Sequence, residues 1–152
     1  MQLLQHETLI VYIEKFIEQE KVTKQKDKQQ VTKLAEQLPL LKKELSIAPS
    51  EVRFQLTINH LCNTTQAVAG AFFIAKQDES LRYVELIAAY AYQIPDSKTL
   101  RFEYGEGLVG QVAKEGKTVQ ISAVPKGYIR VLSGLGQATP SYLLLIPIKN
   151  KE

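Results

Sequence analysis

The spacing of apolar residues changes near residue 48. This change indicates two parts of the chain with different secondary structure. Over residues 3–45, nine of thirteen positions are apolar in two series of seven-residue spacing: Leu3, Ile10, Ile17, Lys24, Val31, Leu38, Leu45, and His6, Ile13, Glu20, Asp27, Leu34, Leu41. A narrow seam of this kind is typical of a two-helix coiled coil. We therefore expect residues 1–47 to form a helical, coiled-coil signalling segment that makes a homodimer through residues 3–45.

Pro39 interrupts this helical pattern. A proline inside a helix removes a backbone hydrogen bond and costs about 3 kcal/mol or more. The helix is therefore expected to kink or restart there, with Leu40–Ile47 as a short second helix. Ala48-Pro49-Ser50 then marks the boundary of a second domain, residues 48–152, which opens with a helix from Glu51 to near Thr65.

Beyond Thr65 the sequence changes to short apolar runs that are typical of strands. The first two runs are separated by a four- to five-residue polar turn, which predicts an antiparallel hairpin. One short helix interrupts the later runs and stops at Gly116. The expected strands are 68–76, 82–92, 100–104, 119–123 and 142–148, and the expected helix is 108–115. The pattern predicts an α+β domain in which helices flank an antiparallel sheet.

Composition excludes several classes of function. The net charge of +3 is small, and the acidic residues Glu18, Glu20 and Asp27 lie before or among the lysines of residues 21–33, so we expect no nucleic-acid partner. Cys62 is the single cysteine, which leaves no internal disulfide and no multi-cysteine metal site. The start of the chain has no secretory signal pattern, and no run approaches the roughly 20 apolar residues of a bilayer span. We expect a cytoplasmic domain, whose full-length protein could be membrane-tethered.

Residues 105–110 match the G-x-G-x-x-G pattern of dinucleotide-binding domains. Such a site needs an acidic residue about 20 positions further on, yet no Asp or Glu occurs between Glu115 and Glu152. The preceding strand also alternates between apolar and charged residues, unlike a strand buried in a parallel sheet. We interpret the glycines as a tight turn that leads into a closely packed helix.

Three segments together resemble one family of signalling domains. They are the small-residue strand 67–74, the segment Gly105-Glu106-Gly107-Leu108-Val109-Gly110-Gln111-Val112-Ala113, and the final strand with Ile146-Pro147-Ile148. In this order they resemble GAF domains, which are related to PAS domains, and in particular those of bacterial sensor histidine kinases. Domains of this family continue into one more strand that pairs centrally in the sheet. Because the chain stops at Glu152, we expect either a fragment or a different strand that completes the sheet.

The resemblance does not identify a cofactor. The cysteine that holds a tetrapyrrole in light-sensing relatives and the N-K-F-D-E signature of cyclic-nucleotide-binding relatives are absent. Both histidines, His6 and His60, precede the first strand of that domain, which argues against haem ligation. Free-methionine sulfoxide reductases share this fold but need a second cysteine. We expect no catalytic residue and no metal site, and the cofactor stays unknown.

The candidate ligand pocket combines aromatic residues near strand ends with polar residues of the loop before the last strand. Its predicted members are Tyr90, Tyr92, Phe102, Tyr104, Tyr128, Arg130, Ser133, Thr139 and Tyr142. The alternative for the tyrosines is a role in the sheet and core.

The sequence therefore predicts a sensory domain of a two-component signalling protein. It would bind a small molecule and act through helices on an output domain of the same polypeptide. The alternative is a ligand-free dimerisation module, and a sulfoxide reductase is a more distant one.

Overall fold

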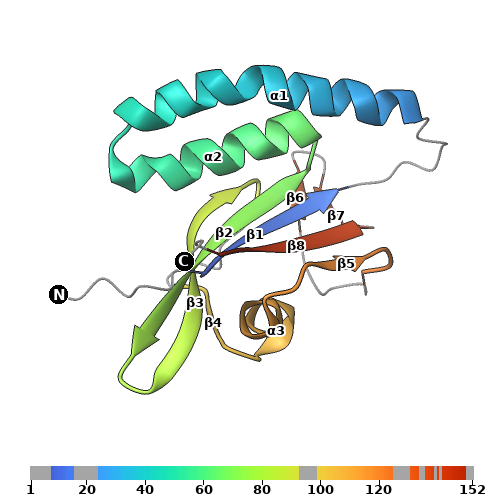
Figure 1. Ribbon diagram of the computed structural model, residues 1–152. Helices are drawn as coiled ribbons and strands as arrows, with labels where there is room; N and C mark the ends of the chain where they lie inside the picture. Colours follow the sequence, from blue (N-terminus) through green and yellow to red (C-terminus); the bar gives the residue numbers. More distant parts are fainter. Residues whose placement is uncertain are drawn as a thin grey trace.

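The computed structural model describes residues 8–15, 24–92, 99–124, 131–133, 136–138, 140 and 142–149. Helices α1 (Lys24–Ile47) and α2 (Ser50–Thr65) lie on one side of an antiparallel sheet, and α3 (Gly107–Glu115) lies on the other (Figure 1). The helix α1 packs chiefly against α2, which in turn packs on the sheet. The predicted α+β class, with helices flanking an antiparallel sheet, is confirmed. In the part of the chain that the structure describes, no helix is both long and apolar enough to traverse a bilayer.

The main sheet has six strands in the order β4-β3-β2-β1-β8-β5, and each neighbouring pair is antiparallel. The strands are β1 (Thr8–Lys15), β2 (Ala69–Asp78), β3 (Leu81–Tyr90), β4 (Arg101–Glu103), β5 (Val119–Ile121) and β8 (Tyr142–Lys149). A separate two-stranded ribbon pairs β6 (Val131–Ser133) with β7 (Gly136–Ala138). The turn between β2 and β3 forms the predicted hairpin, with a register shift at Phe72/Phe73.

The first strand differs from the sequence-based expectation. We expected one helical seam from residue 3, but residues 8–15 form β1, and the described helix α1 runs from Lys24 to Ile47. The segment Thr8-Leu9-Ile10-Val11-Tyr12-Ile13 is rich in β-branched and aromatic residues, which favour strands. Its continuous apolar run also fits a strand with neighbours on both sides. Pairing of two copies of the remaining helical part, 24–45, stays a prediction.

The strand β1 occupies the centre of the sheet. It pairs with β2 from Leu9↔Ile74 to Glu14↔Ala69, and with β8 from Thr8↔Lys149 to Lys15↔Tyr142. The resemblance implied that a central strand would follow Ile148. In the structure a segment that precedes the expected domain boundary supplies a central strand instead, and it joins the β4-β3-β2 half to the β8-β5 half.

The helix α1 does not restart at Pro39. One helix runs from Lys24 to Ile47 and contains Pro39, so the expected separate helix at residues 40–47 is wrong. Proline lacks the N–H that would bond to Ala35, yet one missing bond in a 24-residue helix leaves the other bonds of the ladder in place. Leu41, two residues beyond Pro39, is 7% exposed and packs toward α2.

Two hydrophobic clusters hold the layers together, one on each face of the sheet. On the α2 face, Ile58 and Cys62 meet Phe72 and Ala88. A Cβ at Gly70 would lie 2.5 Å from the Cys62 Sγ atom, so this strand position needs glycine for α2 to approach. Gln55 also fixes α2 to β3, because its Nε2 donates to the Ala89 oxygen at 2.7 Å.

The second cluster lies under α3, which crosses the sheet between the edge strands β4 and β5. Val109 and Val112 of α3 pack there against Leu143 and Leu145 of β8. A Cβ at Gly110 would overlap the Glu103 carbonyl oxygen, so this glycine permits the close approach of α3 to β4. Gly105 and Gly107 have positive φ values of 95° and 57°. The G-x-G-x-x-G segment thus forms a turn and a tightly packed helix start in an antiparallel sheet, as the sequence indicated.

Candidate functional site

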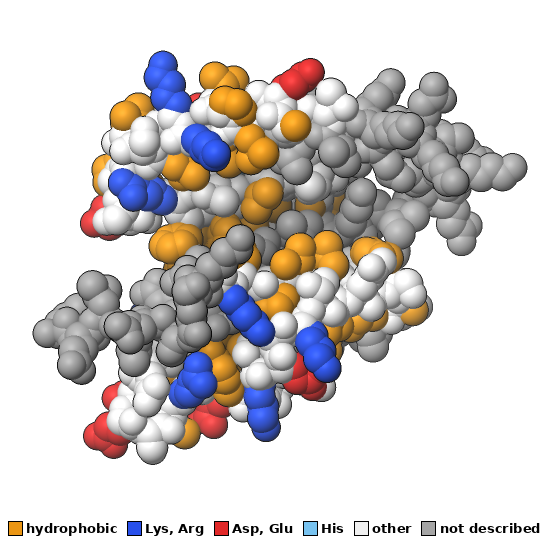
Figure 2. Space-filling view, in the orientation of Figure 1, with side chains coloured by type: hydrophobic (Ala, Val, Ile, Leu, Met, Phe, Trp, Pro, Cys, Tyr) orange, Lys and Arg blue, Asp and Glu red, His pale blue; other side chains and the backbone are white. Residues whose placement is uncertain are grey.

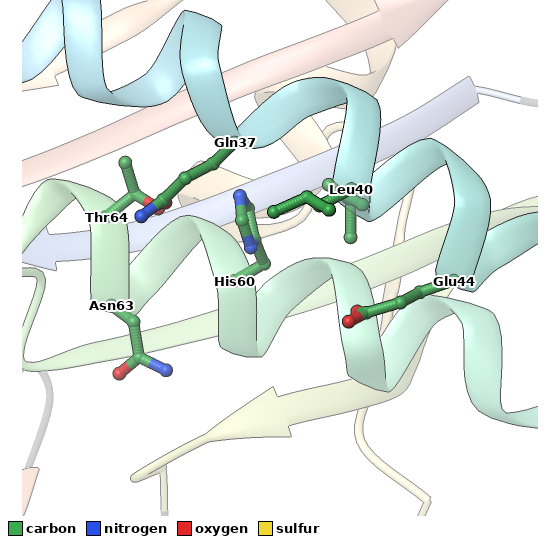
Figure 3. A pocket seen from close by; sticks show the side chains of 7 residues that line it. Gln37, Leu40, Glu44, His60, Asn63 and Thr64 are labelled. Carbon is green, nitrogen blue, oxygen red and sulfur yellow. The ribbon is translucent and has the colours of Figure 1, made fainter.

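A cleft of about 340 Å³ lies between α1 and α2, on the side of α2 away from the sheet. Residues from both helices line it, at spacings of three or four residues that place them on one helical face. The helix α1 contributes Gln37, Leu40, Leu41 and Glu44, and α2 contributes His60, Asn63 and Thr64. Figure 3 shows Gln37, Leu40 and His60 between the two helices, whereas the side chain of Asn63 points away from α1. The volume lies at the lower end of the range for small-molecule sites.

A hydrogen bond closes one end of the cleft. The Thr64 hydroxyl donates to Gln37 Oε1 at 2.9 Å. Thr64 is only 6% exposed, so this bond between α1 and α2 satisfies a buried polar group. Because Gln37 Oε1 accepts the Thr64 proton, the amide nitrogen of Gln37 stays available as a donor. The bond fixes the spacing of the two helices at this end.

His60 lies in the middle of the cleft, with its ring between Gln37 and Leu40 (Figure 3). Its Nε2 atom is buried and has no hydrogen-bond partner among the described residues. A buried nitrogen without a partner costs about 1–3 kcal/mol relative to one that is satisfied. A ligand group that hydrogen-bonds to Nε2 would recover this free energy.

The opposite end of the cleft carries a negative charge. Glu44 is the single charged residue among the described side chains of the lining, and within the same part of the chain no hydrogen bond or ion pair is found for its carboxylate. It lies in the last turn of α1, which contains no basic residue. Arg53 lies nearby in sequence, but its Nε donates to the Ala48 oxygen at 3.0 Å in the connection between the helices.

The predicted pocket residues are divided between the two faces of the sheet. Tyr92, Phe102 and Tyr104 pack against the cluster under α3. Tyr90 packs on the α2 face, where its hydroxyl donates to Asn63 Oδ1 at 3.2 Å. Tyr90 therefore contacts Asn63, a residue that lines the cleft between the helices, whereas the other three residues pack in the cluster on the opposite face of the sheet.

Tyr104 has an unusual environment within the second cluster. The Arg82 guanidinium carbon lies 4.5 Å from the centre of the Tyr104 ring, which is a cation–π contact. The Tyr104 hydroxyl oxygen is buried, and no described residue hydrogen-bonds to it. Phe102 stacks obliquely on Phe73, with ring centres 5.8 Å apart. These contacts place both residues in the packing of the sheet.

The remaining predicted pocket residues lie in β8, in the separate ribbon or outside the described part of the chain. Tyr142 begins β8 and is partly buried, and Ser133 ends β6. Tyr128, Arg130 and Thr139 lie outside the described residues. Of the nine predicted residues, Tyr92, Phe102 and Tyr104 pack against the same hydrophobic cluster under α3.

Sequence reasoning missed the cleft because its lining contains no known motif. In the sequence His60 was excluded as a haem ligand, and its neighbour Cys62, two positions further on, points to a different side of α2. Cys62 is fully buried against the sheet, and burial raises the pKa of its thiol to about 11. The available signal was the polar set His60, Asn63 and Thr64 at helical spacing, opposite a second such set on α1.

Over the described residues, no group of three or more His, Cys, Asp or Glu side chains is placed to hold a metal ion. Comparison of the chain with protein-family models, with curated proteins and with solved structures found no match.

Proposed function

We propose that the chain is a regulatory domain of a signal-transduction protein that binds a small molecule between α1 and α2. The observation that carries this proposal is the cleft of about 340 Å³, whose lining includes His60 with its buried, unpartnered Nε2 atom. A purely structural contact between two helices would be expected to fill this space or to satisfy the nitrogen.

The position of the cleft supports a regulatory role. The helix α1 packs chiefly against α2, so the cleft forms part of the contact that holds α1 to the rest of the domain. A ligand that binds one spacing of the two helices more tightly than another shifts the population toward that spacing. In the proposed sensor histidine kinase, α1 would pass this shift to an output domain of the same polypeptide.

A screen of metabolites and nucleotides by thermal unfolding tests the proposal. A compound that binds only the folded state raises the unfolding temperature. We expect the shift to vanish in Leu40→Trp, because Leu40 lines the cleft and is 63% exposed, so an indole can fill the space from the open side. Leu81→Trp is the matched control, since Leu81 is 55% exposed on the β2–β3 hairpin.

Amide hydrogen exchange then tests whether ligand binding affects α1 and α2. A bound ligand should slow exchange in α1 and α2 more than in β3 and β4. A screen without hits, or hits whose shifts persist in Leu40→Trp, would contradict a ligand site in this cleft.

One observation favours the second candidate, a ligand-free dimerisation module. Three large apolar side chains of α1 are exposed: Leu38 at 43%, Leu40 at 63% and Ile47 at 80%. Hydrophobic side chains are visible on the helical layer at the top of Figure 2. A second copy could cover them, and the two functions are compatible if the ligand changes the dimer.

A further inference from the structure

We infer that the ligand of the α1–α2 cleft is a small organic cation: an apolar body with a protonated amine or amidine and a second hydrogen-bonding group. This inference deepens the proposed function, because it takes the cleft as the ligand site and names the chemistry that fits it. It rests on the charge, the apolar surface and the unpartnered nitrogen of the lining.

The charge of the lining selects the sign of the ligand. Glu44 supplies a carboxylate, and the other lining residues are amides, a hydroxyl, an imidazole and two leucines. Among the side chains that the structure describes, no lysine or arginine lines the cleft. Of these side chains, only Glu44 is charged, so an anionic ligand such as a phosphate would meet like charge there. Glu44 has no ion-pair partner in the described part of the chain, and a ligand cation would supply one.

The end of α1 adds to this negative potential. The C-terminal end of a helix carries a partial negative charge that favours cations within the last turn. Glu44 lies in this turn together with Leu45, Ser46 and Ile47, none of which is basic. Arg53 opposes the effect in part, because it donates to the Ala48 oxygen just beyond the helix end.

The rest of the lining selects the shape of the ligand. Leu40 and Leu41 form an apolar wall on α1, which an aliphatic or aromatic body can cover. His60 lies between Gln37 and Leu40 in Figure 3, with its buried Nε2 atom unpartnered. A rotation of the imidazole ring toward the ligand would expose this atom. A hydroxyl or amide on the apolar body then bonds to it in either tautomer, because such groups donate and accept.

Three probes of equal shape test the charge directly: 3-hydroxybenzylamine, 3-hydroxybenzyl alcohol and 3-hydroxybenzoate. At about pH 7.5 they carry charges of about +1, 0 and −1, and each keeps the phenolic hydroxyl for His60. Binding to the full chain is followed by the NMR signals of the His60 ring. The chain has two histidines, His6 and His60, so the His60→Gln variant assigns these signals.

We expect the amine to bind about threefold or more tightly than the alcohol, and the benzoate to bind more weakly than either. In Glu44→Gln the amine should lose this advantage while the affinity of the alcohol is unchanged. Glu36→Gln is the control, because it removes the same charge from an exposed position of α1 that does not line the cleft.

The possible results separate the two proposals. Equal affinities for the three probes, or a preference for the benzoate, overturn the cationic ligand while the cleft remains a ligand site. The same conclusion follows if Glu44→Gln and Glu36→Gln weaken the amine equally. If no probe moves the His60 signals, the cationic ligand is also overturned, and the metabolite screen with Leu40→Trp then decides independently on the ligand site.

Discussion

At the scale of single residues, the close packing around Cys62 makes its thiol unsuitable as a nucleophile. Its side chain is fully buried among Ile58, Phe72 and Ala88, and its sulfur atom occupies the space that a side chain at Gly70 would need. Burial disfavours the charged thiolate and raises the pKa of the thiol from an ordinary value of 9.0 to about 11. A nucleophilic cysteine needs the opposite, an accessible thiolate with a lowered pKa.

This pKa predicts a pH dependence of stability. The folded state holds the thiol proton up to about pH 11, whereas the unfolded state releases it near pH 9.0. The stabilisation is therefore complete below pH 9 and is lost as the pH rises through 11, by on the order of 2 kcal/mol. Urea unfolding at several pH values measures the free energy of unfolding of the wild type and of Cys62→Ala. Between pH 9 and 11 this free energy should fall more steeply with pH for the wild type. An equal pH dependence of the two proteins would contradict the assigned environment of Cys62.

At the scale of elements, the strand β1 decides whether one sheet exists. It is hydrogen-bonded to β2 on one side and to β8 on the other, and no other described strand joins these two. Without β1, each half of the sheet would expose an edge of unpaired backbone groups. Pro147 of β8 lies opposite Ile10, in a part of β8 that β5 does not reach, since β5 pairs only with Leu143–Leu145.

A proline in β1 should therefore be severely destabilising. Val11 pairs with Phe72 on β2 and with Ile146 on β8, and Val11→Pro removes its N–H from the ladder. We expect a loss of at least about 3 kcal/mol, a large share of the stability of a typical domain. Val11→Ile keeps the N–H and the branched side chain and should unfold close to the wild type. Urea unfolding followed by circular dichroism measures both, and equal midpoints would show that β1 is not a central strand.

At the scale of the whole molecule, the layers differ in how firmly they are held. The helices α2 and α3 each pack on the sheet through a hydrophobic cluster, whereas α1 packs chiefly on α2 and leaves apolar side chains exposed. Removal of residues 1–47 would also remove β1, so a truncated chain cannot separate dimerisation from folding. Surface substitutions on α1 can separate dimerisation from folding.

We predict that the full chain forms a dimer through α1. Light scattering should give about twice the 17.1 kDa mass of the chain. Leu38→Glu should give the monomer mass, because a carboxylate in an apolar helix contact is costly. Leu81→Glu, on the β2–β3 hairpin, should remain dimeric. A wild type that is monomeric at all concentrations, or equal effects of the two substitutions, would contradict the α1 interface.

The elements with clear local signals could be predicted from the sequence alone. The helices that begin near Ser50 and Gly107 have polar and apolar residues at helical spacing, and Gly116 marks the end of the second helix. Both signals are local, so they can be recognised without the tertiary structure. The hairpin β2–β3 and the strands β4, β5 and β8 were found within about two residues at each end. The glycine segment was also interpretable, because positive φ angles at Gly105 and Gly107 are a local requirement.

Only the tertiary structure decided the state of residues 8–15 and the position of the cleft. An apolar run such as Leu9–Ile13 fits a helix seam or a central strand, and the choice depends on whether β2 and β8 are there to pair with it. The cleft depends on how α1 lies on α2, because it brings Glu44 and His60 together across 16 positions of sequence. Local propensity is a property of neighbours in the chain, whereas strand pairing and helix packing depend on neighbours in space.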